Sequence, residues 1–115
     1  MVTLFGIRNC DRCRQAVRWF TARRVEHRFH DLREDGVDSR LLRSWLAAVP
    51  TATLINKRST SWRALQPEQR AAATEAQQLE LLQATPTLIK RPVVVIGKQV
   101  LVGYDEAGWT RLLTD

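Results

Sequence analysis

The sequence predicts an α/β fold in which a βαβ half and a ββα half are separated by a block of helices. Three observations support this order. An apolar run at residues 2–6 leads into an amphipathic segment at 10–24, a polar and helix-prone stretch occupies 51–85, and a β-branched run at 93–96 is followed by a tight turn. A length of 115 residues suits one domain with a single core.

The first half begins with a short buried strand at 2–6 and continues through a loop into the amphipathic helix. Asn9 is the expected N-cap of this helix, so Cys10 would occupy the first helical position. The residues expected on the buried face follow i, i+4, i+7 spacing: Cys13, Val17 and Phe20. Residues 27–32 alternate enough to form a second strand.

The middle of the chain carries clear helix boundaries. Asp38 is expected to cap a helix that Pro50 ends, and Thr74 with Gln77 forms a capping-box pattern before a leucine-rich segment that Pro86 closes.

The second half reads as a hairpin followed by a helix. Gly97 and Lys98 form the expected turn, and Asp105 caps the last helix. Core packing is the expected role of Trp45 and Trp109.

A Cys-x-x-Cys motif lies where the first strand meets the first helix. Together with the order of elements, this position is typical of a thioredoxin-like fold with helices inserted between its two halves. We therefore predict a single domain over 1–115, with a thioredoxin-like core at about 1–33 and 86–115 and a helical insertion at about 37–85.

The composition limits where the protein works. Hydrophobic residues make up 44% of the chain and charged residues 26%, as in soluble globular proteins. There is no apolar run of about 18 residues, so we expect no membrane association. There is also no secretory signal pattern, and two closely spaced cysteines in such a chain indicate a reducing compartment. We expect a cytoplasmic monomer.

The net charge is +6, and seven arginines fall between Arg8 and Arg28. Nucleic acid, an acidic protein partner and a small anionic substrate are all compatible with that charge. We find no nucleic-acid-binding module and no aromatic interleaving, so we expect no direct nucleic-acid binding and favour an anion site near Cys10.

Cys10 is the candidate nucleophile. In the first turn of a helix, unpaired N–H groups and the helix dipole stabilise a thiolate, and Arg8, Arg12 and Arg14 add positive charge. Cys13 can simply pack in the core, but its spacing of one helical turn also suits a disulfide with Cys10, so it is a candidate resolving thiol.

A metal site is not expected. Two histidines give the pattern Cys-x2-Cys-x13-His-x2-His, but a zinc finger needs three to five residues between its histidines. Residues three apart on a strand, as His27 and His30 would be, point to opposite faces.

Arg91 and Pro92 precede the β-branched strand. They can form an ordinary basic loop in which proline starts a strand. Alternatively, thioredoxin-like folds place a cis proline here, facing the reactive cysteine, and Arg91 would then offer a forked guanidinium to an oxyanion or carboxylate.

Several short motifs, in this order and spacing, resemble the arsenate reductase (ArsC)-like family, in particular its YffB and Spx branches. They are Gly6 to Asp11, Phe29 to Asp31, Asp35 to Asp38, Asn56 to Arg58 with Thr60 and Trp62, Ile89 to Pro92, and Val102 to Tyr104. The resemblance implies a thioredoxin-like fold with a helical insertion, a nucleophilic cysteine matching Cys10, and an arginine matching Arg91 that holds the substrate anion.

The chain also departs from true arsenate reductases, which carry a histidine shortly before the cysteine and further arginines. This sequence has no histidine at 5–7 and no arginine at 54–56 or 102–104. Arg58 is the nearest arginine that could replace the mid-chain one. The resemblance therefore does not favour arsenate as the substrate.

The YffB branch implies a glutathione-dependent thiol reductase, with glutathione as co-substrate, a small thiol or disulfide as substrate and no bound cofactor. The Spx branch implies instead a redox-sensing regulator that binds the RNA polymerase α subunit through a Cys10–Cys13 switch. The residues that we expect to bind glutathione or substrate are Asn9, Arg12, Arg14, Arg58 and Pro92.

Overall fold

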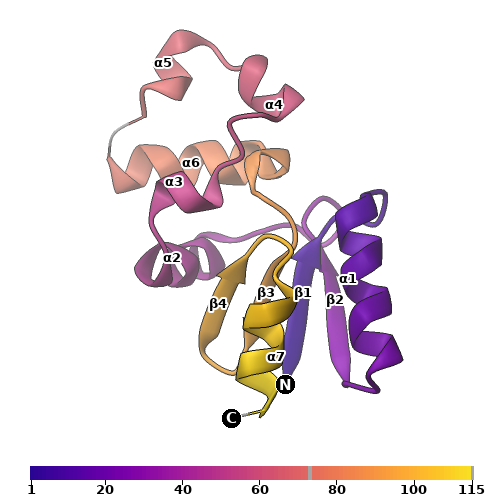
Figure 1. Ribbon diagram of the computed structural model, residues 1–115. Coiled ribbons are helices and arrows are strands. Elements are labelled where there is room, and N and C mark those ends of the chain that lie inside the picture. Colours follow the sequence, from indigo (N-terminus) through magenta and orange to yellow (C-terminus); the bar gives the residue numbers. More distant parts are fainter. Residues whose placement is uncertain (73, 115) are drawn as a thin grey trace. The chain divides into compact units, whose positions relative to one another are not determined.

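The computed structural model describes residues 1–72 and 74–114. Its contacts divide the chain into two compact units (Figure 1). The core unit comprises 1–35 and 91–115, and the helical unit comprises 36–90. The insertion predicted at 37–85 falls inside the helical unit. In the described part of the chain, no helix has both the length and the apolar character needed to span a bilayer.

The core unit is the predicted arrangement of a βαβ half and a ββα half. Its elements are β1 (Val2–Gly6), α1 (Asp11–Ala22), β2 (His27–Asp31), β3 (Val93–Ile96), β4 (Gln99–Val102) and α7 (Glu106–Thr114). The sheet order is β2-β1-β3-β4, in which β1 and β2 are parallel and the other pairs antiparallel. This is the thioredoxin-like topology, and the fold class predicted from the sequence is confirmed.

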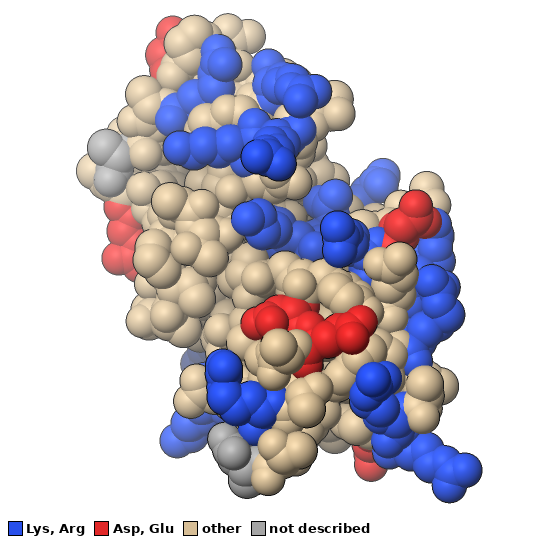
Figure 2. Space-filling view, viewed as in Figure 1, with Lys and Arg blue, Asp and Glu red and all other residues tan. Residues whose placement is uncertain are grey.

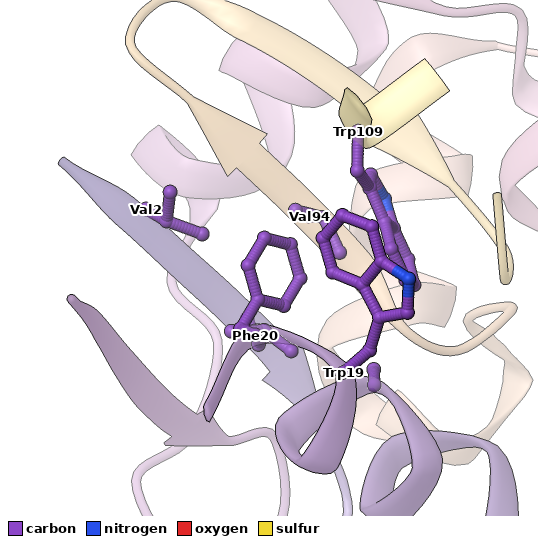
Figure 3. Packing of buried hydrophobic residues seen from close by; sticks show 7 residues of the cluster. Val2, Trp19, Phe20, Val94 and Trp109 are labelled. Atoms are coloured by element: carbon purple, nitrogen blue, oxygen red, sulfur yellow. The ribbon is translucent and has the colours of Figure 1, made fainter. Parts of the chain in front are cut away.

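One face of the sheet carries the core of this unit (Figure 3). Val2 and Leu4 are two residues apart on β1, so they point to the same side, and α1 and α7 both pack there. Trp109 of α7 lies with its ring centroid 5.3 Å from Trp19 and 5.1 Å from Phe20 of α1. These aromatic contacts join the C-terminal part of the first helix to the last helix.

The turn and the last cap of the core unit follow the sequence. Gly97 has φ of 62° in the hairpin, a conformation that glycine adopts without steric cost. The Asp105 carboxylate accepts the N–H of Gly108 at 3.0 Å at the start of α7. Both predictions are confirmed.

The helical unit contains short helices around one longer pair. They are α2 (Ser39–Ala48), α3 (Thr51–Leu54), α4 (Thr60–Arg63), α5 (Pro67–Arg70), α6 (Glu75–Ala84) and the 3-10 turn η1 (Pro86–Leu88). Asp38 caps α2 by accepting the N–H of Leu41 at 2.8 Å, and Thr74 with Gln77 forms the predicted capping box of α6. Helices α2 and α6 pack together, and Trp45 is buried.

Gly6, the last residue of β1, allows α1 to approach the sheet closely. A Cβ atom there would overlap the Cys13 sulfur and lie 3.3 Å from the Cys13 Cβ. Only glycine leaves this space, so the position of the Cys-x-x-Cys turn depends on a residue outside it.

We expect Gly6→Ala to destabilise the protein by about 1–3 kcal/mol, because an inserted methyl group must displace a packed neighbour. Chemical denaturation measures this loss. In a double-mutant cycle, Cys13→Ala should recover part of it, because the sulfur is the closest obstacle. If the cost of Gly6→Ala is the same with and without the Cys13 sulfur, the overlap is not its cause.

Candidate active site

Cys10 occupies the N-cap of α1, with φ of −138° and ψ of 122°. Its carbonyl accepts the first helical bond, from Arg14 N at 3.0 Å, which defines the cap position. The prediction that Asn9 is the N-cap is therefore wrong. Asn9 lies one residue earlier in the turn, where its Oδ1 accepts from Arg14 Nη1 at 3.4 Å. The Asp31 carboxylate of β2 accepts the Arg8 N–H at 3.0 Å and so holds the preceding loop, and the helix begins only after this loop.

The Cys10 thiolate is stabilised by three groups. The sulfur is half-exposed, and its partial burial opposes ionisation. The Cys13 N–H, the Cys13 thiol and the Arg91 guanidinium outweigh that cost and hold the Cys10 pKa below its ordinary value. In the structure Cys10 makes no conventional side-chain capping bond, but the Cys13 N–H is placed to stabilise its anion.

Cys13 has the opposite environment. It is 1% exposed, and its burial raises its pKa to about 12, although the backbone of Ile7 partly offsets this. The nearby Cys10 sulfur raises it further. At neutral pH Cys13 is therefore a neutral thiol that can donate to the Cys10 anion. Cys10 is therefore the more exposed and the more acidic of the two thiols.

The segment before β3 completes this site. The Arg91–Pro92 peptide bond is cis, as predicted. The Pro92 carbonyl accepts the N–H of Gly103 at 2.8 Å, which ties the segment to the end of β4. The half-buried Arg91 side chain lies beside the Cys10 sulfur. The structure shows its contact with Cys10, and its role in holding a substrate anion stays a prediction.

Asp31 organises the loop that leads to Cys10. It is 2% exposed and accepts the backbone N–H groups of Arg8 at 3.0 Å, Arg33 at 2.8 Å and Glu34 at 2.9 Å. Although burial opposes its ionisation, these bonds and the Arg8 guanidinium keep its pKa low. Sequence reasoning gave Asp31 no role. The sequence did offer one signal, because Asp31 is a charged residue at the end of a strand with an alternating pattern, where it is buried.

The other predicted binding residues have separate surroundings. The Arg12 guanidinium lies 5.8 Å from the Tyr104 ring centroid, and Arg14 pairs with Asp11. Arg58 belongs to the helical unit, where its N–H donates to Asn56 Oδ1 at 3.0 Å. Binding of glutathione or substrate by Asn9, Arg12, Arg14, Arg58 and Pro92 stays a prediction.

Both histidines pack against aromatic rings. His27 lies 5.9 Å from Phe20, on the face covered by α1, and His30 lies 5.0 Å from Phe5, which points to the opposite face. The two imidazoles therefore lie on opposite faces of the sheet, as residues three apart on a strand do. Within 1–72 and 74–114, no three His, Cys, Asp or Glu side chains form a cluster able to hold a metal ion.

Comparison with known proteins gives related sequences and structures. A model of the ArsC family matches residues 5–112. An uncharacterized protein of Haemophilus influenzae is 37% identical over 106 residues, which cover 92% of this chain and 93% of that protein. The global transcriptional regulator Spx of Streptococcus pneumoniae is 25% identical over 108 residues, which cover 92% of this chain and 80% of Spx.

Among solved structures, the YffB (PA3664) protein is similar with a TM-score of 0.92 and 35% identity, covering 98% of this chain and 99% of its own. The match therefore includes both units and the cysteine turn, and the fold is the one that the resemblance implied. This chain belongs to the ArsC family.

Proposed function

We propose that this protein is a glutathione-dependent thiol–disulfide reductase in which Cys10 is the nucleophile. One observation carries the proposal: Cys10 is half-exposed with a lowered pKa beside Arg91, while its neighbour Cys13 is buried and protonated. Such an asymmetric pair is suited to attack on a disulfide. Glutathione is kept reduced in the cytosol, so the proposal places the protein in the cytoplasm.

In the first half-reaction, the Cys10 thiolate attacks the glutathione sulfur of a mixed disulfide. An S–S bond forms between Cys10 and glutathione, the original S–S bond breaks, and the substrate sulfur leaves as a thiolate that takes a proton from water. Negative charge spreads over three sulfurs during this exchange. A fixed guanidinium at Arg91 stabilises that charge, or a glutathione carboxylate, more strongly than mobile water does.

In the second half-reaction, the thiolate of another glutathione attacks the glutathione sulfur held on Cys10. Oxidised glutathione forms and the Cys10 thiolate returns, so one glutathione is consumed for each substrate thiol released. Cys13 could instead attack Cys10 and form an internal disulfide. A pKa of about 12 leaves it almost wholly protonated at neutral pH, which favours the glutathione route.

The proposal does not extend to arsenate. A tetrahedral oxyanion needs several charge-assisted contacts, and the segments 54–56 and 102–104 supply no arginine. A second candidate function is supported by the similarity to Spx and by the contact between the two thiols: a redox-sensing regulator that binds the RNA polymerase α subunit.

Turnover separates the two candidates. With glutathione, a glutathionylated peptide and coupled reduction of oxidised glutathione, we expect sustained turnover that Cys10→Ser abolishes and Cys13→Ser retains. Mass spectrometry should find a glutathione adduct on Cys10, and mild peroxide without glutathione should give the Cys10–Cys13 disulfide. Absence of turnover, together with redox-dependent capture of the RNA polymerase α C-terminal domain, would favour the regulator.

Alkylation tests the assignment of the nucleophile. Because the Cys10 pKa is lowered, its labelling by iodoacetamide should reach its plateau at a lower pH than the labelling of an ordinary thiol. An ordinary cysteine has a pKa of about 8.5. Cys13, with a raised pKa, should stay unlabelled over this range. Peptide mapping identifies the labelled residue, and faster labelling of Cys13 would exclude Cys10 as the nucleophile.

Substitution of Arg91 tests the anion contact. Arg91→Ala should lower kcat/KM for a glutathionylated substrate by about 10- to 150-fold, the cost of one charged hydrogen-bonding group. Arg91→Lys should recover only part, because an ammonium cannot make a planar two-point contact. Arg28→Ala, an exposed arginine on β2, is the control. An Arg91→Ala variant with wild-type kcat/KM would contradict the proposed role.

A further inference from the structure

A hollow of about 340 Å³ lies between α1 and β2, and we call it the α1–β2 groove. Its lining residues are Arg8, Cys13, Arg14, Val17, Arg18 and Phe29. Val17 and Phe29 are half-buried and pack against the hydrophobic core, so they give the groove an apolar floor. An apolar side chain placed there would lose contact with water without displacing the fold.

Three arginines line this floor. Arg8 lies 5.6 Å from the Phe29 ring centroid and pairs with Glu34, and Arg14 pairs with Asp11. Arg18 is exposed and makes no ion pair with any residue in the described part of the chain. Figure 2 shows Lys and Arg side chains along the right-hand edge of the view, over α1. The groove thus has an apolar floor and, at Arg18, a positive charge that no carboxylate of the described residues pairs with.

One end of the groove lies beside the turn that leads to Cys10. Arg14 Nη1 lies 3.4 Å from the Arg8 carbonyl, in the turn directly before Cys10, and Cys13 lies at the base. Along α1, the eight residue steps from Cys10 to Arg18 span about 12 Å. An extended chain covers that distance in about three to four residues. A polypeptide whose cysteine reacts at Cys10 can therefore reach Arg18 with its neighbouring residues.

We propose that the α1–β2 groove binds an acidic polypeptide segment carrying an apolar side chain, and that this segment is the protein half of the mixed disulfide. The inference rests on the proposed function and names its substrate class. The apolar side chain would lie on Val17 and Phe29, and a carboxylate would meet Arg18. The segment departs with the substrate thiol when Cys10 takes over the glutathione sulfur.

Other occupants fit less well. The floor offers one half-buried ring, Phe29, and no exposed aromatic on which nucleotide bases could stack. A small inorganic anion would leave the apolar floor uncovered. The neighbouring hollow formed by Gln15, Arg18, Trp19, Tyr104 and Glu106 carries a carboxylate, which disfavours an anion there.

The test compares three glutathionylated peptides of equal length that differ only at the positions three and four residues from the cysteine. These two positions hold Leu and Glu in the acidic peptide, Leu and Lys in the basic peptide, and two alanines in the third. We expect the acidic peptide to have the highest kcat/KM, and Arg18→Glu to lower it by about five- to tenfold. Arg43→Glu, an exposed arginine of α2, changes the net charge equally and should have little effect. Val17→Thr, which keeps the shape of the side chain, should weaken the leucine contribution.

Two further measurements distinguish failure of this inference from failure of the proposed function. Glutathione–cystamine is a mixed disulfide too short to extend from Cys10 into the groove. Wild type and Arg18→Glu should therefore turn it over equally. Fluorescence anisotropy of the reduced acidic peptide with Cys10→Ser measures groove binding without chemistry. If no disulfide is turned over, the proposed function fails while this binding still tests the groove.

Three results would overturn the inference: equal kcat/KM for the three peptides, equal effects of Arg18→Glu and Arg43→Glu, or displacement of the peptide by a single-stranded oligonucleotide at the same ionic strength. The second result would mean that net charge alone attracts the peptide.

Discussion

Stabilisation of one thiolate at the start of α1 is the constraint on which the rest of the site depends. Cys10 stands at the N-cap, where the Cys13 N–H and thiol and the Arg91 guanidinium converge on its sulfur. Two of these groups belong to the buried Cys13 in the first turn of α1, and the third comes from the cis-proline segment. Since Cys13 is buried and remains neutral, the pair has one anion and one donor rather than two competing charges.

The scaffold around this turn explains how it is held. Gly6 leaves room for the Cys13 sulfur beneath α1, and Asp31 gathers three backbone N–H groups, one of them from the loop before Cys10. These two residues sit at the ends of neighbouring parallel strands, paired in register. The ends of these two strands therefore hold the Cys-x-x-Cys turn in place.

Local signals in the sequence were sufficient for most of the fold. Asp38, Thr74 and Asp105 cap helices as predicted because a side-chain cap is a contact within one turn. The N-cap at Asn9 was wrong because bonds from β2 to the preceding loop, which are distant in sequence, set where α1 begins. The role of Asp31 was missed for the same reason. The cis bond before Pro92 was predicted only through the fold, since no local pattern specifies it.

The most direct test of this account is a pH titration of thiolate absorbance in the ultraviolet. We predict that one thiol ionises at a pH below the ordinary cysteine pKa, that the other ionises only near pH 12, and that Cys10→Ser removes the first transition. It also predicts that Arg91→Ala moves that first transition to higher pH. Two thiols titrating together at an ordinary pKa, or a low transition that persists in Cys10→Ser, would contradict it.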